Sequence, residues 1–252
     1  MMMSMKYKIY LISLKKDENR RQRLKKLFKN YDDFIVIDAV SSKEMSAIKY
    51  YESLIKSYKK AKRIISPAEL GCTLSHMRVY EEFLKNDSDY ALIFEDDVIG
   101  DEIGIKKAFE SIKALKNDNF VIILGGEQGV LSFDKAFGKK INDNLIKISK
   151  YSLADVARTV CYIVSKTSAK KILEYQKNAL CIADEWEKLL GENDIECYYS
   201  DIFAHASDQD SSIENERELK SSLMPRKIKR KLSFKLFSLI DRFQSKLVKD
   251  LL

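Results

Sequence analysis

The chain has 252 residues, 45% hydrophobic and 33% charged, a composition typical of a folded globular protein and not of a disordered one. Its net charge of +7 is concentrated at one end, because residues 224–252 hold nine Lys or Arg against two Asp. The rest of the chain is balanced, which argues against a nucleic-acid-binding surface on the body of the protein.

No run reaches the roughly 20 apolar residues that a membrane-spanning helix needs. Residues 1–21 lead from a short apolar run into charge without a small-residue cleavage site, so we expect a cytoplasmic protein without a secretory signal. The cysteines form no C-x-x-C pair, which argues against a zinc knuckle or a disulfide framework. We expect buried free thiols at Cys72, Cys161, Cys181 and Cys197.

In chain order, residues 7–14 predict a buried strand, 17–30 a helix capped by Asp17, and 33–40 a second strand rich in β-branched residues. This β-α-β beginning predicts a parallel pair of strands with a right-handed crossover. Residues 43–62 follow as a polar helix.

The next helix carries a clear start signature. Ser66 is a suitable cap, Pro67 suits the first helical position, and Glu69 completes a capping box. The helix is expected to run to about Asn86. Gly71 inside it costs about 1 kcal/mol relative to Ala, which a close approach of backbone or ligand would explain.

Residues 89–94 predict a third strand, which is apolar on both faces and therefore central and covered on both sides. It runs directly into Glu95, Asp96 and Asp97, whose adjacent carboxylates repel one another. Ligands of α/β sheets bind beyond the carboxyl ends of the strands, where such acids can hold Mg²⁺ or Mn²⁺ with a diphosphate. The alternative is that Asp96 or Asp97 caps a helix starting near Asp101. The triplet by itself leaves both readings open.

Further strands are expected at 119–126, 159–165 and 195–200, with helices at 167–176 and 184–192. Strands alternating with helices predict an α/β sandwich on a mostly parallel central sheet. Neither G-x-x-x-x-G-K-[ST] nor G-x-G-x-x-G is present. This excludes a P-loop and leaves a dinucleotide-binding fold without its signature.

Several segments, taken together and in order, resemble glycosyltransferase family 25, the family of the bacterial lipooligosaccharide galactosyltransferases. The most specific feature is E-x-G-C-x-L-S-H, followed by E-D-D after the next strand. The matching segments cover roughly residues 6–205 and read IYLISLKKDENRRQRL, FIVIDAV, SPAELGCTLSHMRVYEEFL, ALIFEDDVI, TVCYIVSKTSAKKIL and ADEW. The resemblance implies a GT-A-like nucleotide-sugar-binding fold that holds a UDP-sugar through Mn²⁺ or Mg²⁺.

By this resemblance Glu95 and Asp97 flank the metal, Asp97 is the strongest candidate for direct contact, and His205 completes the metal site. A surface-loop histidine is the alternative reading of His205, and a solvated helix face is the alternative for Arg20. The resemblance also implies a set of residues that bind the donor: Ser13, Leu14, Arg20, Asp38, Ser75, Glu95 and Asp96.

Catalysis needs further residues. His76 shares a helix face with apolar residues, so a packed core histidine competes with a catalytic one. Transfer with inversion requires a carboxylate base that is not committed to the metal. We nominate Asp184, with Glu185 beside it and Trp186 placed to stack on a sugar ring. An N-cap followed by a core Trp is the alternative reading.

Residues 227–252 place Leu and Phe at spacings of three and four with Lys and Arg opposite, which predicts a basic amphipathic helix. We therefore divide the chain into a glycosyltransferase domain, 1–215, and a tail, 216–252. The tail is expected to hold the protein peripherally on the inner face of the cytoplasmic membrane through anionic lipid. Packing on the body or on a second subunit of a homo-oligomer is the alternative.

The sequence thus predicts a metal-dependent, inverting glycosyltransferase. It would move a hexose, galactose in the first place, from a UDP-sugar to a lipooligosaccharide or related cell-surface glycan. A non-catalytic nucleotide-sugar-binding or scaffold protein of the same fold is the alternative. A metal-dependent nucleotide diphosphatase is disfavoured, because the basic and aromatic segments suit donor capture better than water activation.

Overall fold

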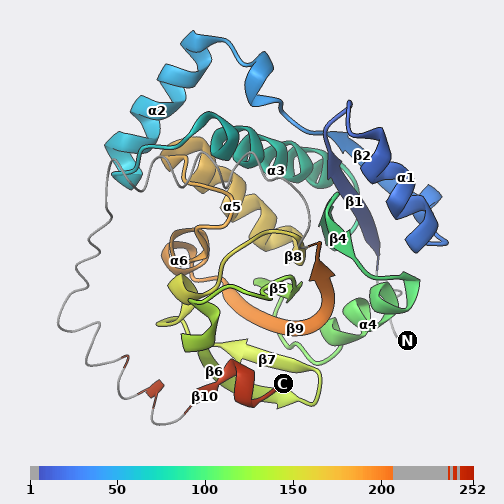
Figure 1. Ribbon diagram of the computed structural model, residues 1–252. Helices are drawn as coiled ribbons and strands as arrows, with labels where there is room; N and C mark the ends of the chain where they lie inside the picture. Colours follow the sequence, from blue (N-terminus) through green and yellow to red (C-terminus); the bar gives the residue numbers. More distant parts are fainter. Residues whose placement is uncertain (1–5, 207–237, 239–240, 243–244) are drawn as a thin grey trace.

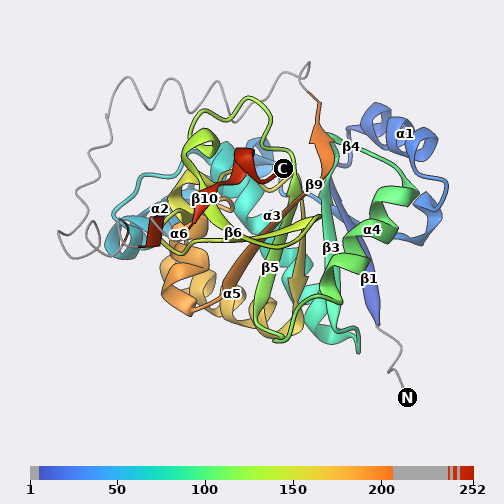
Figure 2. The same ribbon diagram turned by 90° about the horizontal axis from the view of Figure 1, so that it is seen from below.

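The computed structural model describes residues 6–206, 238, 241–242 and 245–252. A central sheet carries helices on both faces (Figure 1 and Figure 2). The strands are β1 (Tyr7–Ser13), β2 (Phe34–Asp38), β3 (Tyr90–Glu95), β4 (Val98–Ile99), β5 (Phe120–Gly125), β6 (Phe137–Asn142), β7 (Leu145–Ile148), β8 (Cys161–Ser165), β9 (Glu196–His205) and β10 (Lys246–Leu247). The helices are α1 (Glu18–Leu27), α2 (Ala47–Ala61), α3 (Pro67–Lys85), α4 (Glu102–Ile112), α5 (Lys166–Ala179) and α6 (Trp186–Leu189).

The strands follow the order β10-β6-β7-β9-β5-β8-β3-β1-β2, and β4 pairs with the end of β9. β1 is parallel to both β2 and β3, as the β-α-β beginning predicted, and β5 is parallel to β9. β8 is antiparallel to both of its neighbours. The sheet is therefore mixed, and the predicted parallel character holds for β1, β2, β3, β5 and β9 but not for β8.

The reversal of β8 has a simple cause in the chain path. The β6–β7 hairpin pairs antiparallel to β9, and residues 149–160 then cross to the carboxyl edge of the parallel strands as a loop. A strand that starts at this edge must run against its neighbours. The residues just before β8 are thereby delivered to the edge where ligands bind in α/β sheets.

Alternating residues of the inner strands fill two apolar cores, one on each face of the sheet. In β3, Ala91 and Ile93 pack in the core that includes residues of α3 and α5, whereas Leu92 and Phe94 pack in the core with α1 and α4. All four side chains are fully buried, which confirms the prediction of a central strand covered on both sides. Each large apolar side chain buried in this way contributes about 1.5–3 kcal/mol.

Helix α3 begins as its sequence predicted. The Ser66 hydroxyl accepts from the Glu69 N–H at 3.3 Å, and the Glu69 carboxylate accepts from the Ser66 N–H at 2.9 Å, so both halves of the capping box form. Gly71 lies against the chain that follows β2, because a Cβ atom there would sit 2.6 Å from the Val40 carbonyl oxygen. The expected close backbone approach is therefore confirmed.

The sequence pattern did not predict β4, β6, β7 or β10. It did place a helix near Asp101, and α4 starts there, but the cap is Asp101 itself, which accepts from the Gly104 N–H at 2.8 Å. The reading of Asp96 or Asp97 as the cap of this helix is therefore wrong.

The predicted tail helix over 227–252 lies largely outside the described residues. Residues 241–242 are helical, but Lys246 and Leu247 form β10 on the edge strand β6. Val248 is fully buried, and its N–H donates to the Ala136 carbonyl at 2.8 Å. The helix therefore does not continue to residue 252.

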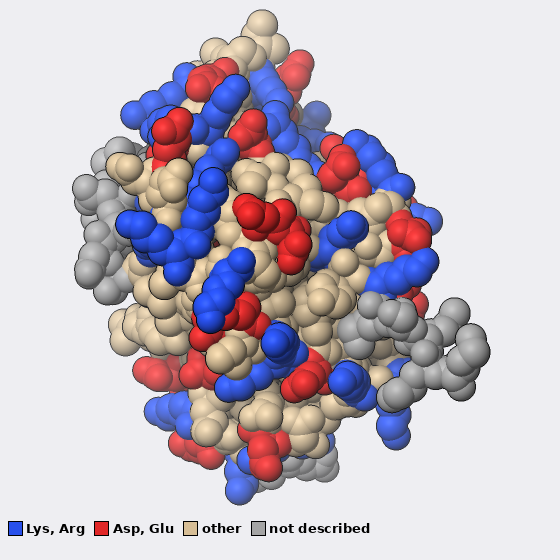
Figure 3. Space-filling view, turned by 90° about the vertical axis from the view of Figure 1, so that its right-hand side faces the viewer, with Lys and Arg blue, Asp and Glu red and all other residues tan. Residues whose placement is uncertain are grey.

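Among the helices that the structure describes, none is both long and apolar enough to cross a membrane. On the face shown in Figure 3, acidic and basic side chains are interspersed over the described residues, without a broad area of either sign.

We expect the substitution Gly71→Ala to lower the free energy of unfolding by about 1–3 kcal/mol, although Ala is the better helix former. The added methyl group would have to displace the Val40 backbone. Urea unfolding measures the change. The matched control is Gly191→Ala, where the new Cβ would meet Leu153 at an ordinary 3.6 Å. Equal free energies of unfolding for the two variants would contradict this prediction, because they would show that the Val40 backbone can move aside without loss of stability.

Candidate active site

A cavity of about 500 Å³ opens at the carboxyl edge of the sheet. It is bounded by the ends of β1, β3 and β9, the first half of α3, and the chain around residues 158–160 and 182–184. Among the residues nominated from the sequence, those that line it are Ser13, Leu14, Arg20, Ser75, His76, Glu95, Asp96, Asp97, Asp184 and His205. Asp38 and Glu185 do not line it.

The three adjacent acids at the end of β3 turn to three different partners. Glu95 Oε1 lies 3.1 Å from His76 Nε2 and also accepts from the Thr159 hydroxyl. Asp96 Oδ1 accepts from Arg20 at 2.7 Å, and Asp97 Oδ2 lies 3.2 Å from His205 Nε2. The repulsion expected within the triplet is therefore relieved by different hydrogen-bonding or ion-pair partners for each acid.

Asp96 forms part of the cavity wall. Its carboxylate is buried, and this burial raises its pKa, while the hydrogen bond and charge of Arg20 act in the opposite direction. Arg23 fixes the following turn by donating to the carbonyl oxygens of Asp96 and Val98, at 2.8 and 3.2 Å. Arg20 is thus held at the cavity by an ion pair, and the reading of a purely solvated helix face does not describe it.

Asp97 and His205 are brought together by backbone pairing. β9 is long enough to leave the main sheet and pair with β4, which sets His205 opposite Val98. Ala206 N–H also donates to the Asp97 carbonyl at 3.1 Å. Asp97 Oδ1 is buried without a hydrogen-bond partner in the described part of the chain. A carboxylate oxygen in this state beside an imidazole nitrogen fits a divalent cation, which would supply the missing partner.

His76 is both a core residue and a cavity residue. Only 2% of its surface is exposed, and its Nδ1 lies 2.8 Å from the Tyr162 hydroxyl, which in turn lies 2.7 Å from the Tyr80 hydroxyl. Its Nε2 edge faces Glu95 and the cavity. The Nδ1 edge of the ring is therefore packed in the core, as one interpretation of the sequence expected. The Nε2 edge is available to the cavity, as the functional interpretation expected.

The two acids nominated in ADEW, Asp184 and Glu185, lie in different surroundings in the structure. Asp184 lines the cavity, whereas Glu185 pairs with Lys188 at 3.0 Å and lies 3.9 Å from Arg63, away from the cavity lining. Trp186 is 1% exposed and donates its indole N–H to the Arg158 carbonyl at 3.0 Å. The expectation that Trp186 stacks on a sugar is therefore wrong, because its ring belongs to the core.

Ser13, Asp38 and Ser75 hold the edges of the cavity in place. Arg21 donates to the Ser13 hydroxyl, to the Ser13 carbonyl and to Asp38 at 3.0–3.1 Å, which ties the ends of β1 and β2 together. The Ser75 hydroxyl accepts from the Val40 N–H at 2.8 Å. Asp38, which was nominated as a donor-binding residue, has a half-exposed carboxylate that pairs with Arg21 and does not line the cavity.

Sequence reasoning missed the contribution of the chain before β8. Arg158 and Thr159 line the cavity, and Arg158 has a left-handed backbone with φ of 59°. The Arg158 guanidinium donates to the carbonyl oxygens of Gly126 and Gln128 at 2.6 and 3.0 Å. No sequence signal identified these residues, because a parallel β8 would have placed them at the opposite edge of the sheet.

Glu127, in the Gly-rich turn after β5, is a second residue that the sequence did not single out. It is 3% exposed, its Oε1 has no hydrogen-bond partner among the described residues, and its Oε2 accepts from the Ala157 N–H at 3.4 Å. Burial raises the pKa of the Glu127 carboxyl to about 8, against the opposing effects of Ala157 and Arg158 and with a further rise from Asp184. At neutral pH this side chain therefore keeps its proton.

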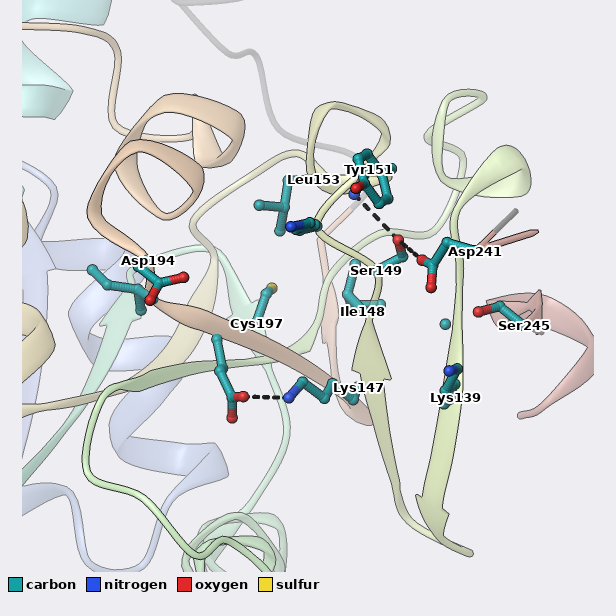
Figure 4. Close-up of a pocket in the computed structure, with 14 residues that line it drawn as sticks. Lys139, Lys147, Ile148, Ser149, Tyr151, Leu153, Asp194, Cys197, Asp241 and Ser245 are labelled. Atoms are coloured by element: carbon teal, nitrogen blue, oxygen red, sulfur yellow. Dashed lines mark hydrogen bonds and ion pairs between the residues drawn. The ribbon is translucent and has the colours of Figure 1, made fainter. Parts of the chain in front are cut away.

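A second cavity, of about 360 Å³, lies at the other end of β9 (Figure 4). Two of its charged side chains, Lys147 and Glu196, pair with one another, and the Ser149 hydroxyl donates to Asp241. None of the nominated residues lines it. The cavity beside the acidic triplet is therefore the candidate active site.

Comparison with known proteins identifies the family of this chain. The family model described as glycosyltransferase family 25 (LPS biosynthesis protein) matches residues 6–186. This chain belongs to glycosyltransferase family 25. The family assignment made from the sequence is thereby confirmed, and so is the expected α/β sandwich with a central sheet.

Three relatives are similar over comparable lengths. A putative glycosyltransferase of Haemophilus influenzae is 31% identical over 67% of this chain and 57% of its own length. Procollagen galactosyltransferase 1-A of Xenopus laevis is 28% identical over 66% of this chain and 28% of its own. Lipooligosaccharide biosynthesis protein lic2B of Haemophilus influenzae is 27% identical over 65% and 61%. The matches thus span less than two thirds of each relative.

We expect the substitution Glu127→Gln to change how stability depends on pH. Because the folded-state pKa of about 8 lies above the ordinary 4.5, the wild-type protein loses stability as pH rises between these values. The Gln variant does not titrate there. Its free energy of unfolding should therefore rise relative to wild type by about 1.4 kcal/mol per pH unit between pH 5 and 8.

Urea unfolding at several pH values measures this difference, with Glu82→Gln on the surface of α3 as the matched control. A constant difference between wild type and Glu127→Gln across the range would show that Glu127 ionises like a solvated carboxyl.

Proposed function

We propose that this protein is a metal-dependent, inverting glycosyltransferase that transfers a hexose, galactose in the first place, from a UDP-sugar to a lipooligosaccharide or related cell-surface glycan. The observation that carries the proposal is the Asp97–His205 pair in a cavity at the carboxyl edge of the sheet. One buried carboxylate oxygen of Asp97 has no hydrogen-bond partner among the residues that the structure describes. The names of the relatives, which include galactosyltransferases and a lipooligosaccharide biosynthesis protein, support the choice of sugar and acceptor.

Binding of the UDP-sugar donor would involve the cavity residues at the ends of β1, β3 and β9 and on α1. Asp97 and His205 would hold Mn²⁺ or Mg²⁺, and the bound metal would neutralise charge on the departing diphosphate. Arg20 lies on the same wall, and its guanidinium adds a positive charge that suits a diphosphate. The end of β1, with Ser13 and Leu14, supplies backbone groups at the position expected for the nucleoside.

The acceptor side rests on the chain that precedes α6. Asp184 lines the cavity from a loop far in sequence from the metal-binding acids. A carboxylate that is not committed to the cation is able to take the proton from the attacking hydroxyl group. Inversion then requires a single displacement, with the hydroxyl on one side of the sugar and the diphosphate on the other. Asp184 is therefore our candidate for the catalytic base.

The basic tail completes the proposal. Each of its Lys or Arg residues would contribute about 1 kcal/mol next to an anionic lipid surface. An enzyme that extends a lipid-linked glycan gains from being held at the inner face of the cytoplasmic membrane. Its acceptor would then be presented to the cavity in the plane of the membrane.

We expect wild-type protein with Mn²⁺ to release UDP from UDP-galactose when a lipooligosaccharide acceptor is present, and Asp184→Asn to lower kcat by about 10²–10⁴-fold. Donor binding should be unchanged, because the amide keeps the shape of the carboxylate but does not accept the proton. A UDP-release assay over a panel of sugar nucleotides measures both. Release from no sugar nucleotide, despite tight UDP binding, would favour the non-catalytic binding protein.

We expect Asp97→Asn to weaken the Mn²⁺-dependent binding of UDP by about tenfold or more, because the amide loses the charge that holds the cation. Isothermal titration with and without chelator measures this effect. Asp87→Asn, on an exposed carboxylate that pairs with Lys6, is the matched control. Equal UDP affinity of Asp97→Asn and wild type in Mn²⁺ would remove the metal from the proposal.

A further inference from the structure

A second group of potential metal ligands lies in the wall of the same cavity. Cys72 Sγ, a ring nitrogen of His76 and a carboxylate oxygen of Glu95 all lie within 4.8 Å of one another. Cys72 and His76 are four residues apart on α3 and therefore share a helix face, while Glu95 comes from the end of β3. All three residues line the cavity.

We propose that Cys72, His76 and Glu95 form a Zn²⁺ site of their own, separate from the Asp97–His205 pair and with one coordination position open to the cavity. The choice of ion follows from the ligands. A thiolate and an imidazole suit Zn²⁺, whereas Mg²⁺ and Mn²⁺ prefer the oxygen-rich surroundings of Asp97. Three protein ligands and an open fourth position are the usual arrangement of a zinc site that is accessible from solution.

The spacing of the ligand atoms suits this ion. Ligands 2.0–2.3 Å from a tetrahedral Zn²⁺ lie roughly 3.3–3.7 Å from one another. His76 Nε2 and Glu95 Oε1 are 3.1 Å apart, and all three atoms lie within 4.8 Å. The separations therefore exceed the tetrahedral range by about 1 Å at most, which is within reach of small side-chain rotations.

The surrounding hydrogen bonds hold the ligands in suitable orientations. A ring nitrogen that binds Zn²⁺ usually has its opposite N–H engaged by an oxygen atom, and His76 Nδ1 lies 2.8 Å from the Tyr162 hydroxyl. The Tyr162 hydroxyl is able to accept from Nδ1–H and donate to Tyr80, so the ring can present a lone pair at Nε2. Thr159 orients the Glu95 carboxylate in the same way.

The position of the thiol distinguishes Cys72 from the other cysteines. Cys72 is partly buried and lines the cavity, whereas the remaining three thiols are buried in the cores. Burial raises the pKa of each of those three thiols, at Cys161, Cys181 and Cys197. A thiol-dependent metal signal from this protein would therefore report on Cys72.

Co²⁺, a spectroscopic substitute for Zn²⁺, tests the site in the full-length protein without any substrate. We expect a thiolate-to-cobalt charge-transfer band in the near ultraviolet, which Zn²⁺ abolishes by displacement. Cys72→Ser should lose the band and bind Zn²⁺ about tenfold more weakly or worse, measured by competition with a chromophoric chelator. Tyr162→Phe should keep the band with weaker affinity, since it removes only the Nδ1 partner.

Asp97→Asn is the matched control, because it alters the other cation site and should leave the band unchanged. If Cys72→Ser does not fold, protection of the wild-type Cys72 thiol from alkylation by Zn²⁺, read by mass spectrometry, tests the same claim. Absence of the band in wild type, its persistence in Cys72→Ser, or unprotected alkylation would each overturn the proposal. None of these results bears on UDP binding at Asp97, so the failure of one proposal is distinguishable from the failure of the other.

Discussion

The structure of the cavity depends on how three consecutive carboxylates are kept apart. Glu95 ends β3, whereas Asp96 and Asp97 form the turn that leads to β4, but this change of direction alone does not relieve their repulsion. Relief comes from one partner for each acid: His76 from α3, Arg20 from α1 and His205 from β9. Three separate elements must therefore be placed correctly around the end of β3 before the three carboxylates can lie next to one another.

The apolar packing of the central part of the molecule meets this requirement. β3 carries fully buried side chains on both faces, and the helices that supply the partners pack on those faces. The cores fix α1 on one side and α3 on the other, so their polar residues arrive at the carboxyl edge in fixed positions. β9 makes the third approach by bending from the main sheet to β4. The apolar packing thus determines the electrostatics of the site.

The same reasoning separates what the sequence could predict from what it could not. Local signals predicted the capping box of α3 and the central position of β3, because each depends on neighbours in the chain. The placement of His76 and Asp97 at the site came from the family resemblance, since the helical spacing of His76 by itself also suited a core residue. Glu185 and Asp38 were misplaced because their direction depends on partners, Lys188 and Arg21, that no periodicity reveals. The β6–β7 hairpin and the reversal of β8 depend on pairings between distant segments, which the sequence pattern does not show. Because the direction of β8 was not predicted, the cavity residues just before it were not predicted either.

Glu127 does not line the cavity, but it interacts with Arg158, which does, and so affects the charge that the cavity presents. An ionised Glu127 would attract the neighbouring guanidinium and compete with the carbonyl oxygens of Gly126 and Gln128 that now hold it. Because burial keeps Glu127 protonated, Arg158 stays on these carbonyls, and its left-handed backbone is held by the Trp186 indole that donates to its carbonyl. The positive charge of Arg158 is therefore not cancelled within the wall. Arg158 and Asp184 both line the cavity, so a ligand there would meet both a positive and a negative side chain.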